Sequence, residues 1–205
     1  MLGSKDDEIS VISSEQAKKL YAECFGSEKR QINKDGWHSD ITFEPVPSNY
    51  VILRLNELPK IGGDILWAFG YEAYDRLSPA YQKFLEGPTP IYAQPIFNDS
   101  AERDGFQLYG AEQGAPENVG TDLKAVHPVV RTNPITGWKS VYAVGHHAKR
   151  INEVTKDESD HILNWFTLLI IDGEYIYQMF RHCASADQCL DHDLQVLNRW
   201  PAQPE

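Results

Sequence analysis

The sequence predicts a single domain of mixed α/β structure that is mainly β, and three local patterns carry this prediction. Two β-rich runs, 127–132 and 138–144, flank a turn-forming stretch at 133–137, which indicates a hairpin. Residues 37–43 alternate roughly between apolar and polar side chains, as a strand with two faces does. Thr155 and Glu158 form a Thr-x-x-Glu capping box, which is typical of a helix start.

Five apolar residues behind this capping box fall on one face of the predicted helix: Ile162, Leu163, Phe166, Leu169 and Ile170. The remaining elements are expected to be short. Strands or extended pieces are predicted at 50–55, 64–68, 91–94 and 191–196. Helices are predicted at 14–25, near 71–76, and after Ser78, where Pro79 takes the first helical position and Gly87 follows the end. Residues 98–122 are expected to form a long surface excursion, a common form of binding loop or lid.

Composition and charge exclude several classes of protein. The 205 residues are 41% hydrophobic and 24% charged, which is an ordinary globular balance. The formal net charge of -11 argues against nucleic-acid binding and against binding to an anionic membrane, because there is no basic surplus to neutralise phosphates. A small anionic substrate needs only a local pair of cations, so it stays compatible with this charge.

Location is predicted from the same sequence features. No apolar run approaches 18 residues, and residues 1–9 lack the apolar core of a secretory signal. The three cysteines are odd in number and show no CxxC spacing, so we interpret Cys24, Cys183 and Cys189 as reduced thiols of an intracellular protein. We therefore expect a cytoplasmic protein.

The pattern His38-x-Asp40 is the one that carries chemistry. On a strand, residues i and i+2 point to the same face, so the imidazole and the carboxylate would project side by side. One His and one Asp are two-thirds of the 2-His-1-carboxylate facial triad, which leaves three positions on Fe(II) for a bidentate 2-oxo acid and O2. Taken alone the motif is common, and the plain alternative is a surface strand with two polar residues.

Four collinear blocks provide the context for this motif. They are WHSDITF at 37–43, LPKIGGDILW at 58–67, AYDRLS at 73–78 and HPVVRTNP at 127–134, with Gly137 soon after. Together, over roughly residues 30–170, they resemble the taurine dioxygenase-like (TauD/TfdA) family, and the sequence is most similar to its fungal members.

This resemblance implies a double-stranded β-helix, or jelly roll, with helices packed outside, in a single domain over 1–205. His38 and Asp40 would be the first two iron ligands. The implied cofactors are Fe(II) and 2-oxoglutarate as co-substrate, and the partners are O2 and a small acid such as taurine or another sulfonate. The implied reaction decarboxylates 2-oxoglutarate oxidatively to succinate and CO2 and hydroxylates the substrate. Family members often associate, so a homo-oligomer is expected as well.

The sequence departs from the family pattern at the cofactor site. Ile65 stands where the family has a Thr whose hydroxyl contacts a 2-oxoglutarate carboxylate, and a methyl group cannot donate there. The block that carries the distal His ligand and the 2-oxoglutarate-binding Arg has no counterpart, and residues 171–205 look atypical. None of His127, His146, His147, His161, His182 and His192 is expected to complete the iron site, and His127 is interpreted as a packed, hydrogen-bonded residue.

Two other hypotheses therefore stay open beside the dioxygenase. The first is a catalytically inactive truncated family member, either a pseudoenzyme or a mis-spliced product, whose jelly roll is incomplete at its C-terminus. The second is a cupin-like metal-binding module, which would need more histidines on adjacent strands than the sequence offers.

Overall fold

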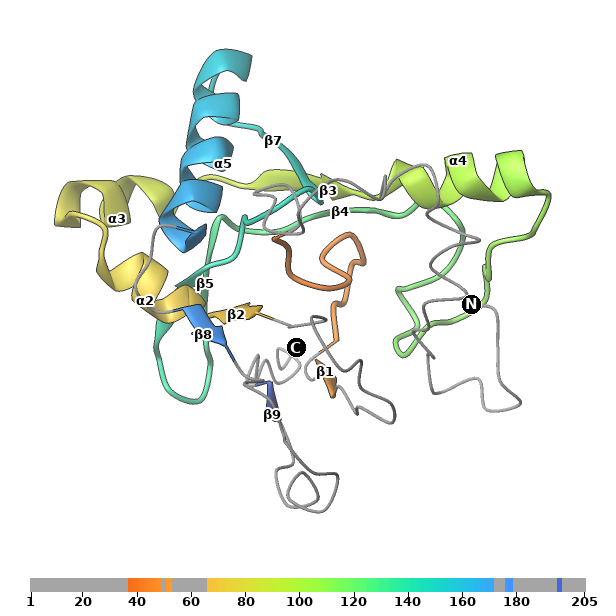
Figure 1. Ribbon diagram of the computed structural model, residues 1–205, viewed down its shortest axis with the longest axis horizontal. Helices are drawn as coiled ribbons and strands as arrows, with labels where there is room; N and C mark the ends of the chain where they lie inside the picture. The colour runs from red at the N-terminus through yellow and green to blue at the C-terminus, as the bar shows by residue number, and fades with distance from the viewer. Residues whose placement is uncertain (1–36, 49–50, 53–65, 172–175, 179–194, 197–205) are drawn as a thin grey trace.

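The computed structural model describes residues 37–48, 51–52, 66–171, 176–178 and 195–196 (Figure 1). Both helices and small antiparallel sheets occur in this part of the chain, which confirms the mixed α/β expectation. Among the described residues the helices hold more residues than the strands, so the expectation of a mainly β domain is not confirmed there. Ile65, the three cysteines, His182, His192 and the helix expected at 14–25 lie outside the described residues.

The largest sheet has three antiparallel strands in the order β4-β3-β7. They are β3 (Pro90–Ala93), β4 (Lys124–Val126) and β7 (Ala148–Ile151). Tyr92 at the centre of β3 is fully buried and lies between Ala125 and Ala148 of its neighbours. Small residues on both sides therefore make room for one large aromatic ring in the core.

The predicted hairpin is present as β5 (Val130–Thr132) and β6 (Lys139–Val141). Asn133 begins the turn, and its side-chain oxygen accepts hydrogen bonds from the backbone N–H groups of Ile135 and Thr136. This is the local bonding for which asparagine is favoured in turns.

Two further strand pairs lie below the central sheet in Figure 1. β1 (Val51–Ile52) pairs with β9 (Gln195–Val196), and β2 (Leu66–Ala68) pairs with β8 (Ile176–Gln178). The strand predictions at 50–55, 64–68 and 191–196 are confirmed for these residues, and the rest of those ranges is not described.

Three of the helices follow their sequence signals. They are α2 (Gly70–Asp75), α3 (Pro79–Leu85) and α5 (Lys156–Ile171). In the capping box, Glu158 accepts hydrogen bonds from the backbone N–H and the hydroxyl of Thr155, both at 2.8 Å. Phe166 and Ile170 are buried in the core, as the helical periodicity predicts.

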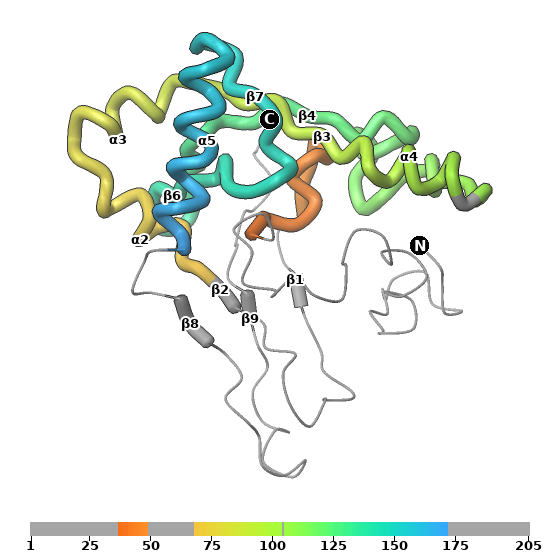
Figure 2. Tube along the Cα trace, turned by 45° about the horizontal axis from the view of Figure 1, so that its top comes forward, coloured from red at the N-terminus to blue at the C-terminus, as the bar shows by residue number. Residues whose placement is uncertain are grey.

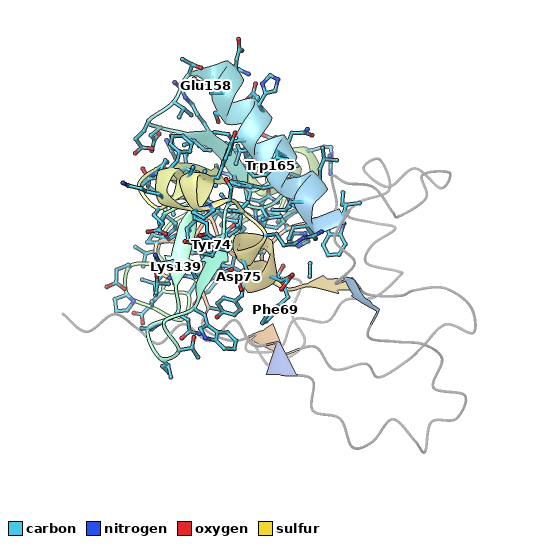
Figure 3. The ribbon with its side chains drawn as sticks, turned by 90° about the vertical axis from the view of Figure 1, so that its left-hand side faces the viewer. Phe69, Tyr74, Asp75, Lys139, Glu158 and Trp165 are labelled. Carbon is cyan, nitrogen blue, oxygen red and sulfur yellow. The ribbon has the colours of Figure 1, made fainter. Side chains whose placement is uncertain are left out.

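Side-chain contacts join these helices to each other and to the hairpin (Figure 3). Trp165 of α5 lies against Tyr81 of α3, with ring centroids 5.2 Å apart. Lys139 of β6 forms an ion pair of 2.8 Å with Glu86, which also accepts a hydrogen bond from the Tyr74 hydroxyl of α2. Buried residues of α2, α3, α5 and the hairpin belong to one hydrophobic core.

The surface excursion expected at 98–122 is partly wrong, because it begins inside a helix. α4 spans Pro95–Asp104 and ends at Gly105, whose φ of 70° is left-handed. Proline at the first helical position and glycine just past the end are ordinary helix signals. Residues beyond Gly105 are irregular until β4 begins.

The strand predicted at 37–43 is also wrong. Only His38 makes a bridge, with Gly145, and residues 40–43 form a turn. Thr42 and Phe43 are 1% and 7% exposed, so two consecutive side chains are buried where a strand would expose one of them. Ile41 has a φ of 57°, which ends the extended backbone. The segment that contains this turn, residues 37–48, lies beneath β3 and β7 (Figure 2).

Within the described residues, no helix has the length and the apolar composition needed to cross a membrane.

Candidate metal centre

His38 and Asp40 are brought together even though they do not lie on a strand. His38 Nε2 and Asp40 Oδ1 are 3.0 Å apart, and the two side chains are 38% and 48% exposed. The hydrogen bond from His38 lowers the pKa of Asp40, and this effect exceeds the opposing effect of desolvation. The carboxylate is therefore anionic at neutral pH and partly open to solvent.

The spacing of these two donor atoms fits a shared metal ion. Donors at about 2.1 Å from a six-coordinate ion, on neighbouring positions, lie about 3.0 Å from each other. Imidazole nitrogen with carboxylate oxygen is also a donor set typical of non-haem iron. Among the described residues, however, no group of three His, Cys, Asp or Glu side chains is placed to hold a metal ion.

Gly145 allows a distant segment of the chain to approach His38 closely. Its φ is 86°, and a Cβ at this position would lie 1.9 Å from the Trp37 carbonyl oxygen and 2.7 Å from His38 Cα. Only glycine fits such a contact. The segment after β6 is thereby fixed directly against His38.

Two histidines of this segment complete an imidazole cluster that the sequence did not predict. The ring centroid of His38 lies 4.9 Å from that of His146 and 5.5 Å from that of His147. The side-chain amide nitrogen of Gln94 lies 3.4 Å from His146 Nε2, and the Gln94 side-chain oxygen is buried without a partner in the described structure. The sequence contains one local sign of this cluster, the adjacent pair His146 and His147. The position of this pair beside His38 depends on contacts between residues more than a hundred positions apart.

His147 is the most enclosed member of the cluster, with 4% of its surface exposed. Its Nδ1 lies 3.1 Å from the Ser39 carbonyl oxygen and 3.2 Å from the Thr42 hydroxyl. Burial, reinforced by the neighbouring His146 and His38, lowers the pKa of His147 to about 4. The ring is therefore neutral at neutral pH.

The other described histidines lie away from this cluster, as expected. His127 is buried and its Nε2 donates to the Glu44 carbonyl oxygen at 2.8 Å, which confirms its structural interpretation. His161 is exposed on α5, where Nδ1 contacts the Asp157 carbonyl oxygen of the preceding turn.

Glu44 and Asn118 connect the segment after the turn at 40–43 to the long loop after α4. Asn118 is 5% exposed, donates to Glu44 Oε2 at 3.0 Å and to the Val46 carbonyl oxygen at 2.7 Å, and accepts from the Val46 N–H. Desolvation raises the pKa of Glu44 to about 7. Burial disfavours the charged carboxylate, so the folded chain favours the neutral form of Glu44 over a wider pH range than the unfolded chain does.

Replacing Glu44 by glutamine should therefore stabilise the chain at pH 8 and have little effect at pH 5. The folded pKa of about 7 exceeds the ordinary value of 4.5, so the wild-type free energy of unfolding falls as the pH rises between these values. Glutamine keeps the acceptor for Asn118 and cannot ionise. Thermal unfolding of both proteins across this pH range measures the difference.

Glu158→Gln is the matched control for this measurement. Hydrogen bonds from Thr155 lower the pKa of Glu158, so its neutralisation should destabilise the chain at pH 8, the opposite sign. A melting temperature of Glu44→Gln that stays below that of the wild type at pH 8 would contradict the assignment.

The sequence matches the model of the family described as "Taurine catabolism dioxygenase TauD, TfdA family" over residues 6–182. The chain belongs to the TauD/TfdA family. The match is wider than the resemblance at 30–170 and extends into the stretch after 171 that looked atypical from the motifs alone.

Two relatives of this TauD/TfdA chain are named for their dependence on α-ketoglutarate, that is, 2-oxoglutarate. It is 43% identical to "Alpha-ketoglutarate-dependent dioxygenase btcD" of Neocamarosporium betae, over 95% of this chain and 54% of that protein. It is 29% identical to "Alpha-ketoglutarate-dependent sulfonate dioxygenase" of Saccharomyces cerevisiae, over 80% of this chain and 33% of that protein. The chain thus spans about half the length of curated relatives that are 38–43% identical to it.

A solved structure supports the same relationship at the level of the fold. The crystal structure of a taurine dioxygenase from Burkholderia xenovorans matches with a TM-score of 0.55 and 26% identity. The alignment covers 70% of this chain and 42% of that protein. The helix-and-sheet arrangement of this TauD/TfdA chain is therefore that of part of a taurine dioxygenase.

Proposed function

We propose that this chain supplies the first two iron ligands of an Fe(II)- and 2-oxoglutarate-dependent dioxygenase, His38 and Asp40. The observation that carries the proposal is the 3.0 Å spacing of His38 Nε2 and Asp40 Oδ1, found at the His-x-Asp motif of a TauD/TfdA member. The described strands form separate small sheets. A single jelly-roll domain over 1–205 is part of the proposal and is supported by the taurine dioxygenase fold match.

Each residue of the pair has a distinct part in holding the metal. Asp40 is anionic because the hydrogen bond from His38 favours the carboxylate, so it would supply negative charge to a divalent cation. A cation bound to both atoms replaces the hydrogen bond between them, so its binding displaces a proton and weakens in acid. Fe(II) held there would supply the oxidative chemistry in which 2-oxoglutarate and O2 are consumed.

The proposed substrate is a small acid such as taurine or another sulfonate. Support comes from the sulfonate dioxygenase of S. cerevisiae at 29% identity, whereas the relative at 43% identity is named only for its dependence on 2-oxoglutarate. Ile65 stands at the family's Thr position, so it would offer 2-oxoglutarate an apolar contact in place of a hydrogen bond. O2 and 2-oxoglutarate are the other small-molecule partners.

A second candidate is a family member that binds metal weakly and does not turn over. The observation in its favour concerns the proposed metal pair, His38 and Asp40. In the described part of the chain, no third His, Cys, Asp or Glu is placed to complete a metal site with them. This candidate keeps the family and the fold and differs only in activity.

Anaerobic titration with Fe(II) and 2-oxoglutarate tests the proposal. We expect a weak visible metal-to-ligand charge-transfer band that is absent in His38→Ala. Succinate formation in air, with taurine and other sulfonates as substrates, then separates the two candidates. A band with succinate formation supports the dioxygenase, and a band without it supports the inactive member. No band from a folded sample would contradict the metal site itself.

A further inference from the structure

The peptide between the two metal-binding residues has its own anchor. Because His38 and Asp40 lie at the start of a turn, strand hydrogen bonds do not fix the residue between them. The Ser39 carbonyl oxygen is instead contacted by His147 Nδ1 at 3.1 Å, from a residue 108 positions later. The Thr42 hydroxyl approaches the same oxygen at 3.5 Å.

The partners of His147 determine which of its nitrogens carries the proton. A carbonyl oxygen only accepts hydrogen bonds, so Nδ1 must be protonated and must donate to Ser39. Thr42 Oγ1, at 3.2 Å from Nδ1, then accepts a second, bifurcated hydrogen bond from the same N–H. The Thr42 hydroxyl in turn donates to the Ser39 carbonyl oxygen. The three groups form one closed arrangement around the Ser39 carbonyl.

The His147 ring is also held in place by its neighbours. It is 4% exposed and stands edge-on to Phe43, with centroids 5.0 Å apart, and to His38, with centroids 5.5 Å apart. Gly145, two residues earlier, fixes its backbone against Trp37 and His38. A ring that cannot turn away is suited to holding a peptide at one position.

We propose that His147 is a positioning residue for the metal pair: by donating from Nδ1 to the Ser39 carbonyl, it sets the spacing of His38 and Asp40. This inference rests on the proposed function in so far as the spacing serves a metal ion. Groups that orient metal ligands from outside the coordination sphere are worth about 10- to 100-fold in metal affinity.

Two amide variants separate hydrogen bonding from simple filling of space. The Nδ2 of asparagine is as many bonds from Cα as Nδ1 of histidine, so His147→Asn can still reach Ser39. The amide nitrogen of His147→Gln lies one bond further out. Fe(II) affinity is measured anaerobically by calorimetry on the full chain, with His161→Gln on the exposed face of α5 as the matched control.

We expect His147→Gln to lose about 10- to 100-fold in Fe(II) affinity. His147→Asn should stay within about threefold of the wild type, well inside that range, and His161→Gln should be unchanged. Equal affinities of the two His147 variants, or a Gln variant that binds like the wild type, would overturn the proposal. The amide NMR spectrum of each variant verifies that it is folded.

A metal-free measurement keeps this inference separate from the proposed function. The ring nitrogen and proton signals of His38 in labelled chain report its contact with Asp40 without any iron. Both variants lose the effect of the neighbouring His147 ring on the His38 signals. Beyond that common change, the His38 signals of His147→Asn should match those of the wild type, and those of His147→Gln should differ from them. If the wild type binds no Fe(II), the proposed function fails, while identical His38 signals in both variants would still refute the positioning role.

Discussion

Replacing Asp40 with asparagine should lower the affinity for Fe(II) by more than about 100-fold, the upper value for a group that only orients a ligand. Asparagine keeps the shape of the side chain and can still accept a hydrogen bond from His38, but it brings no charge. Because the His38–Asp40 pair is about 40–50% exposed, its loss should cost at most about 1 kcal/mol of folding free energy. The melting temperature of the metal-free chain should therefore fall by no more than about 2–4 °C.

Asp160→Asn is the matched control, because Asp160 is an exposed acid of α5 that pairs with Lys156. It should leave Fe(II) affinity unchanged. Calorimetry and thermal unfolding on the same samples give both quantities. An Asp40→Asn chain that binds Fe(II) as the wild type does, while Tm is preserved, would remove Asp40 from the metal site.

Replacing Gly145 with alanine should be the most destabilising single-methyl change near the site. A Cβ there would lie 1.9 Å from the Trp37 carbonyl oxygen, and the residue would keep a φ of 86°. Left-handed backbone costs an L-residue about 1–2 kcal/mol, and forced overlap adds about 1–3 kcal/mol. We therefore expect a loss of about 2–5 kcal/mol in unfolding free energy, together with weaker Fe(II) binding, since His38 must move.

Gly137→Ala isolates the steric part of this effect. Gly137 also has a left-handed φ, 72°, but a Cβ there meets nothing within 4 Å. It should lose only the backbone part, about 1–2 kcal/mol. Denaturant unfolding of both variants measures the difference, and equal losses at the two positions would mean that the close approach at Gly145 carries no energetic weight.

Elements with local signals could be predicted from the sequence. The capping box of Thr155 and Glu158 and the apolar face behind it placed α5, and Pro79 placed the start of α3. α4 was missed because the Gly, Asn, Asp and Glu residues of 98–122 suggested a loop, although Pro95 and Gly105 mark the two ends of the helix.

The site was predicted only in part, for a different physical reason. The motif identified His38 and Asp40 as neighbours, but the alternation around them suggested a strand where tertiary contacts enforce a turn. Thr42 is buried against His147, and His38 is bridged to Gly145. Such contacts join residues more than a hundred positions apart, and local periodicity contains no information about them.

The long separation between Ser39 and His147 also bears on when the proposed metal pair, His38 and Asp40, becomes ordered. The anchor of the metal pair is formed by a residue synthesised 108 positions later, and closing so large a loop costs chain entropy that only tertiary packing offsets. During translation, His38 and Asp40 therefore leave the ribosome well before the segment that orders them. If His38 and Asp40 bind iron as proposed, metallation would follow tertiary folding in this chain, and iron supply after synthesis would matter more than iron supply during it.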